Sequence, residues 1–162
     1  PADPPQWASP WKDLLQRSSP APVLWTYHEL GADLTGRGRS PERSAFLKQI
    51  ITDLTLRKGS SAFWPCAIPC GNTGGEVSFT ASPAYFSAGV ERLMPQVVVV
   101  FGRQAMADIG FDCEGPYFKQ TMISGKLLLT LPEITELLDG AAQRSSSISL
   151  LRALLNTVRF DL

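Results

Sequence analysis

Hydrophobic residues occur along this chain both in short unbroken runs and in stripes at helical spacing. Val23–Tyr27 and Val97–Phe101 are apolar runs with no polar alternation. Runs of this kind are typical of strands covered on both faces, as in the centre of a parallel sheet. The sequence therefore predicts two buried strands, the second of them central.

Serine followed by proline marks three predicted helix starts, because serine caps the first amides and proline suits the first turn. The second start is the strongest: Glu42 favours the positive end of the helix dipole, and an apolar stripe from Phe46 to Leu54 runs toward a stop at residues 57–59. The third helix is expected to end near Met94. The three pairs are Ser9 with Pro10, Ser40 with Pro41, and Ser82 with Pro83.

The remaining pattern alternates strands with helices, which implies a parallel sheet sandwiched between helices. Residues 1–22 read as an N-terminal extension with one short helix, and residues 23–162 as a single three-layer α/β/α domain. Further strands are expected at 61–64, 121–123 and 126–130, helices at about 103–110, 132–138 and 147–158, and loops at 31–38 and from 65 to Gly75.

Composition narrows the class of protein further. The 15 basic residues equal the 15 acidic ones, so no net field draws the molecule toward nucleic acid or anionic lipid. No apolar stretch approaches the roughly 20 residues that span a bilayer, and the N-terminus carries no signal-peptide pattern. Three cysteines are too few for a secreted disulfide scaffold. We expect a cytoplasmic protein that does not enter a membrane.

Neither a metal site nor a cofactor is expected. Cys66 and Cys70 are four residues apart, whereas metal sites favour a closer pair with two further ligands. Cys113 and His28 are the other soft ligands, and both are distant in sequence. Ordinary buried or loop thiols explain these cysteines better.

Candidate catalytic residues follow the first predicted strand. His28 is the only histidine and therefore the only side chain that normally exchanges protons near neutrality. It lies where ligands bind in open α/β sheets, with Tyr27, Glu29 and Asp33 nearby in sequence. A hydrogen-bonded structural histidine is the competing interpretation. Residues 36–38 complete neither a phosphate-binding loop nor a dinucleotide-binding turn.

Arginines gather at the start of the strongest helix. Arg37, Arg39 and Arg43 could hold a phosphate together with backbone amides, or could form a solvated polar loop. Trp7 and Trp11 could pack internally or anchor a protein partner.

Taken in order, the segments from residue 23 to about residue 160 resemble the uracil-DNA glycosylase superfamily, especially its compact bacterial branches. Residues 95–105, PQVVVVFGRQA, are similar to the family pattern P-x-V-I-V-x-L-G-x-x-A. An apolar strand, a glycine-containing loop and a proline-bearing loop precede it in the family's order. The resemblance implies a three-layer α/β/α fold.

Both chemical motifs of the family are eroded. Its G-E-x-P-G loop is replaced by YHELG at 27–31, and Leu131 stands where the family has the histidine that donates to the uracil carbonyl. The iron–sulfur branches place two cysteines before the first strand, and residues 1–22 contain none. Cys66 lies near one family position, but one thiolate cannot hold a cluster.

Three functions follow as hypotheses. The first is a glycosylase-like domain that does not cut and serves as a protein-interaction or scaffold module for an unidentified protein partner. The second is a weak nucleic-acid binder that uses Arg37, Arg39, Arg43 and Arg103, although the neutral net charge weighs against it. The third is a divergent DNA glycosylase in which His28, Glu29 or Asp33 activates water and Tyr27 stacks on a flipped base. We favour the first, so that this chain would not be an enzyme.

Overall fold

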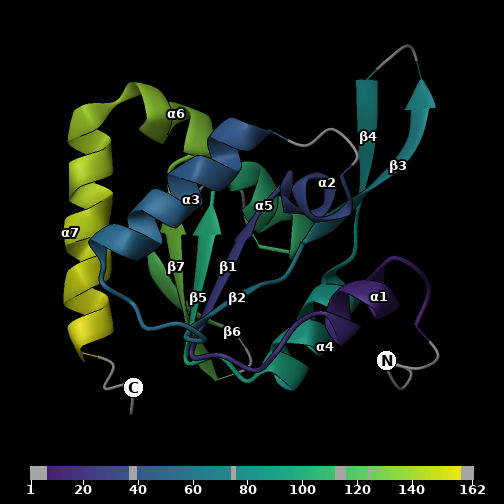
Figure 1. Ribbon diagram of the computed structural model, residues 1–162, viewed down its shortest axis with the longest axis horizontal. Coiled ribbons are helices and arrows are strands. Elements are labelled where there is room, and N and C mark those ends of the chain that lie inside the picture. The colour runs from purple at the N-terminus through teal and green to yellow at the C-terminus, as the bar shows by residue number, and fades with distance from the viewer. Residues whose placement is uncertain (1–6, 37–39, 74–75, 112–115, 124, 158–162) are drawn as a thin grey trace.

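The centre of the molecule is a five-stranded sheet in the order β2-β1-β5-β7-β6 (Figure 1). The computed structural model describes residues 7–36, 40–73, 76–111, 116–123 and 125–157. Four strands are parallel, and β6 pairs antiparallel with β7, so the predicted mainly parallel α/β sheet is confirmed. The strands are β1 (Val23–Tyr27), β2 (Ser61–Phe63), β5 (Val97–Phe101), β6 (Gln120–Ile123) and β7 (Lys126–Leu131).

The two apolar runs form the middle of this sheet. Every residue of β1 and of β5 is buried, and β5 lies between β1 and β7. Helices cover both faces of the strands, which explains why neither run alternates with polar residues. The prediction that Val97–Phe101 is a central strand is confirmed.

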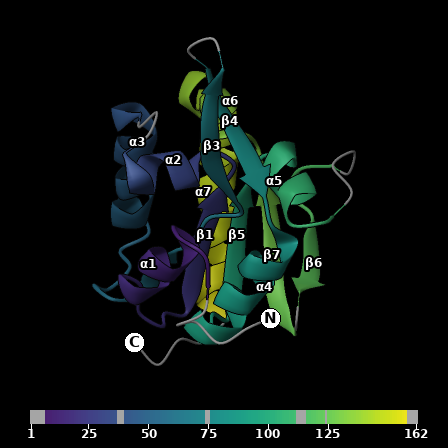
Figure 2. The ribbon, with the colours of Figure 1, turned by 90° about the vertical axis from the view of Figure 1, so that its right-hand side faces the viewer.

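Helices pack on both faces and divide the core into two clusters. Figure 2 shows α3 and α5 on opposite sides of the sheet. None of the described helices is both long enough and apolar enough to span a bilayer. One cluster includes α1 (Trp11–Gln16), α4 (Pro83–Leu93) and α5 (Arg103–Asp108); the other includes Leu30 of α2 (Leu30–Thr35) with α3 (Pro41–Asp53), α6 (Ile134–Asp139) and α7 (Ala141–Thr157).

Two of the three predicted helix starts are confirmed by their capping bonds. The hydroxyl of Ser40 accepts the backbone N–H of Arg43, and that of Ser82 accepts the N–H of Tyr85. The first start is one residue off, because Pro10 is the cap residue of α1 and Ser9 donates its hydroxyl to Asp13 instead.

The prediction of a glycine-containing loop at 31–38 is wrong for residues 31–35, which belong to α2, and residues 37 and 38 lie outside the described residues. Gly31 lies inside this helix. The backbone at Ala67 passes so close to it that a Cβ at position 31 would collide with the Ala67 carbonyl oxygen, so glycine is required by packing. Gly36, at φ +80°, caps the helix in the left-handed region that glycine adopts without strain. The glycines therefore serve packing and termination of a helix.

The loop predicted to run to Gly75 is also wrong. The antiparallel pair β3 (Ala67–Thr73) and β4 (Glu76–Ala81) occupies most of this stretch and projects from the body of the molecule (Figure 1), whereas residues 74 and 75 lie outside the described residues. Two helix boundaries differ as well: α3 ends before residues 57–59, at a cap on Leu54, and α7 begins at Ala141. The hairpin is stabilised by backbone hydrogen bonds between β3 and β4. The proline and glycine content on which the loop prediction rested gives no information about such pairing.

The N-terminal tryptophans belong to the core. Trp7 and Trp11 are 4% and 3% exposed. Trp11 stacks on Tyr85 with ring centroids 5.2 Å apart, and both tryptophans contact Trp64. The expectation that they pack internally is confirmed, and the alternative that they anchor a partner is wrong.

Candidate functional site

Three parallel strands end at one edge of the sheet, and the candidate site lies there. β1, β5 and β7 end at Tyr27, Phe101 and Leu131, and the N–H of Gly102 donates to the carbonyl of Leu131 at 2.8 Å. The residues that follow these strands therefore meet. In open α/β sheets this edge is where ligands usually bind.

His28, directly after β1, pairs with a buried carboxylate. Its Nδ1 is 2.5 Å from Oδ2 of Asp108, and the two side chains are 21% and 5% exposed. Burial lowers the pKa of His28, but the hydrogen bond and the negative charge of Asp108 outweigh it, so the pKa is raised. Among the described residues Nε2 has no hydrogen-bond partner. A carboxylate on Nδ1 leaves Nε2 as the nitrogen that can exchange a proton.

Three further side chains contact this pair: Gln104 from the same helix as Asp108, Cys66 from the segment before β3, and Phe79 from β4. Gln104 donates to Asp108 Oδ1 at 3.2 Å, and the Cys66 thiol lies 3.6 Å from Oδ2. The ring of Phe79, on the projecting hairpin, lies 4.5 Å from the imidazole. Burial first, and then the charge of Asp108, raise the pKa of the Cys66 thiol, so this thiol is neutral.

A second carboxylate, that of Glu133, approaches from the segment after β7. It lies against Gly102, where a Cβ would collide with the carboxyl group, and it accepts the backbone N–H of Gln104. Gly102 has φ +94°, so two independent constraints favour glycine there. Burial and the charge of Glu29 raise the pKa of Glu133. The edge around His28 is thus rich in acceptors and negative charge.

Tyr27 and Asp33 form a separate network that faces α3. The Tyr27 hydroxyl donates to Asp33 Oδ2 at 2.5 Å, Arg43 donates to both carboxylate oxygens at 2.9 and 3.0 Å, and the N–H of Ser40 donates at 2.9 Å. Burial and Asp33 raise the pKa of Tyr27, which is 2% exposed. Its ring presents no face on which a base could stack, and Asp33 is not beside His28.

Leu131 is wholly buried where β7 ends. Its strand position is paired with Phe101, and it packs in the same core cluster as α6. A leucine side chain has no hydrogen-bond donor. The position at which the resemblance would place a donor therefore contributes only packing.

The predicted arginine patch is only partly within the described residues. Arg37 and Arg39 lie outside them. Arg43 is paired with Asp33, and the guanidinium of Arg103 lies 4.3 Å from the ring centroid of Tyr117. The structure does not bring these two arginines together.

Of the cysteines, Cys66 is buried and free, Cys70 is exposed and free, and Cys113 lies outside the described residues. No group of three potential metal ligands occurs within the parts of the chain that the structure describes.

Sequence reasoning found His28 and Glu29 but missed their neighbours. Asp108 and Gln104 lie on one face of α5, four residues apart, and Glu133 follows two residues after Leu131. The spacing of Gln104 and Asp108 directly after a buried strand was an available signal. No sequence signal pointed to Cys66 or Phe79, because only the fold brings the hairpin to this edge.

Comparison of the chain with protein-family models and with curated proteins found no match. The resemblance described above therefore rests on the residues that carry it.

Proposed function

We propose that this chain is a non-catalytic domain of the uracil-DNA glycosylase-like type that acts as a protein-interaction or scaffold module. The observation that carries the proposal is the buried Leu131 at the end of β7. Base excision places negative charge on the departing base, and a positioned donor is what stabilises such charge. A wholly buried leucine provides none.

Electrostatics at the same edge support this proposal. The negative charges of Asp108, Glu29 and Glu133 all raise the pKa of His28, and the charge of Glu29 also raises the pKa of Glu133. Negative charge here opposes both a developing anion and an approaching phosphodiester. Of the four candidate arginines, the two that the structure describes, Arg43 and Arg103, contact Asp33 and Tyr117, so their contacts give no support to the nucleic-acid hypothesis.

The test is an excision assay on single- and double-stranded DNA that contains uracil, run with the wild type and Leu131→His. We expect no base release by the wild type, and little by the variant, because cooperating groups do not act additively. Turnover by the wild type that His28→Ala or Glu29→Gln abolishes would overturn the proposal. In parallel, affinity purification from the native cell should recover a protein partner in stoichiometric amount.

A divergent glycosylase is the second candidate, and the His28–Asp108 pair is the observation that favours it. A carboxylate that orients an imidazole and stabilises its protonated form is the arrangement of a general base. His28 would take a proton from water through Nε2. Asp108→Asn separates the two candidates, because it should leave a scaffold's partner binding intact and should reduce any hydrolysis by orders of magnitude.

A further inference from the structure

The sheet has an open edge at β2. The carbonyl of Ser60 and the N–H of Trp64 bond to β1. Because alternate residues of a strand direct their backbone groups to the same side, Ala62 also faces β1. Ser61 and Phe63 therefore direct their N–H and C=O groups away from the sheet, and no backbone hydrogen bond from another described segment reaches them.

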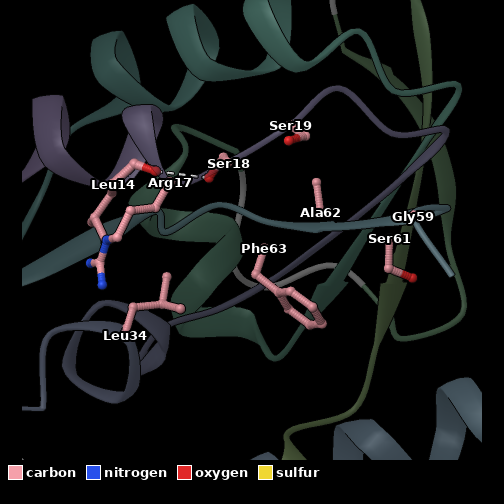
Figure 3. Close-up of a pocket in the computed structure, with 9 residues that line it drawn as sticks. All are labelled: Leu14, Arg17, Ser18, Ser19, Leu34, Gly59, Ser61, Ala62 and Phe63. Atoms are coloured by element: carbon pink, nitrogen blue, oxygen red, sulfur yellow. Dashed lines mark hydrogen bonds between the residues drawn. The ribbon is translucent and has the colours of Figure 1, made fainter.

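A cavity of about 320 Å³ lies along this edge (Figure 3). Its floor is the whole of β2, from Ser61 to Phe63, and its walls come from the end of α1 and from Leu34 of α2. Leu14 and Arg17 stand on the α1 side in Figure 3, opposite Phe63. The cavity thus follows the strand's backbone.

A second cavity of about 320 Å³ adjoins the first. Leu34 and Phe63 line both, and α3 contributes Leu47 and Lys48 to the second. We call the two together the β2-edge groove. It offers two apolar pockets, one on each side of Phe63, beside a row of outward backbone groups.

The charges along the groove are basic. Arg17 and Lys48 line the two cavities, and neither forms a salt bridge with a described residue. Asp33 also lines the second cavity, but Arg43 neutralises it. An occupant that carries carboxylates complements this edge, whereas a basic segment does not.

We propose that the β2-edge groove binds an extended, acidic segment of a partner protein, which adds to the sheet as a strand next to β2. This inference rests on the proposed function, because it identifies the surface of the interaction module. A strand of three residues is about 10 Å long, so a short segment suffices. Ser61 and Phe63 supply main-chain hydrogen bonds, the two pockets take apolar side chains, and Arg17 and Lys48 pair with the carboxylates.

The probe is a displayed library of random decapeptides, selected on the purified chain. Bound sequences should alternate apolar residues with aspartate or glutamate. Arg17→Glu with Lys48→Glu should weaken a selected synthetic peptide about tenfold, because each reversal removes one exposed ion pair and adds repulsion. A peptide with lysine in place of its acidic residues should bind this double variant better than the wild type. Lys119→Glu is the control for a charge reversal elsewhere on the surface, because Lys119 directly precedes β6 at the opposite edge of the sheet from β2.

Hydrogen exchange supplies a readout that charge alone would not move. On peptide binding, the amides of Ser61 and Phe63 should become protected, while that of Ala62 should change little because it already bonds β1. Failure to select any binder, binding that ignores the double reversal, or protection elsewhere would overturn the proposal. So would a self-association that the double reversal abolishes, since the occupant would then be a second copy of this chain.

Failure here and failure of the proposed function are distinguishable. Base excision by the wild type would remove the scaffold role whatever the groove binds. A partner recovered from the native cell that binds the double variant unchanged would keep the scaffold role and remove the groove.

Discussion

Val99→Asp is the substitution for which the structure gives the largest and most calculable effect. Val99 is the middle residue of β5, is 0% exposed, and lies between Trp25 of β1 and Leu129 of β7. A buried carboxyl without a partner protonates, and from an ordinary pKa of about 3.9 this costs about 4 kcal/mol near pH 7. The neutral acid still lacks hydrogen bonds, which adds about 2 kcal/mol. Lost apolar burial adds about 1.5 kcal/mol.

The expected total of about 7.5 kcal/mol is a large share of the 5–15 kcal/mol typical of a domain. The assay is urea unfolding followed by the fluorescence of the buried tryptophans. Val99→Asn is the matched control, since it carries the polar cost without the ionisation. The gap between the two variants should shrink by about 1.4 kcal/mol for each pH unit below neutrality. An aspartate variant that melted within about 2 °C of the wild type would refute the central position of β5.

Three further predictions concern the described networks. Asp33→Asn should destabilise the fold by about 3–5 kcal/mol, because it breaks a partly buried ion pair with Arg43 and removes the carboxylate that also accepts hydrogen bonds from Tyr27 and Ser40. Urea unfolding measures this cost, and a cost like that of an exposed aspartate would contradict the prediction. The raised pKa of His28 means that its stabilisation is complete below its ordinary 6.5 and is lost as pH rises through the higher folded value. The stability difference between wild type and His28→Asn should therefore be larger at about pH 6 than at about pH 8.5, and Asp108→Asn should remove this dependence. Gly89→Ala should destabilise despite the better helix propensity of alanine, because its Cβ would collide with the Trp64 indole; a rise in melting temperature would show that this packing is loose.

The residue patterns predicted where the candidate site lies, but few of the hydrogen bonds and charge pairs within it. The apolar run before His28 is enough to place that histidine at the carboxyl edge of a buried strand, because such runs end at the sheet's edge. Its partner, 80 residues away, could not be found in this way. Asp33 illustrates the opposite error: it is near His28 in sequence, yet the turn into α2 directs it to Arg43, away from the imidazole.

Elements whose signals are local could be predicted from the residues alone. Uninterrupted β-branched and aromatic runs predicted β1 and β5, and serine–proline pairs predicted the starts of α3 and α4, because an unbroken apolar run and an N-terminal cap are each visible in consecutive residues. The packing of Gly31, the pairing of the β3–β4 hairpin and the acid that pairs with His28 could be learned only from the three-dimensional fold. These features depend on backbone and side chains brought together from distant parts of the chain, and such contacts leave no periodic trace in the residues that make them.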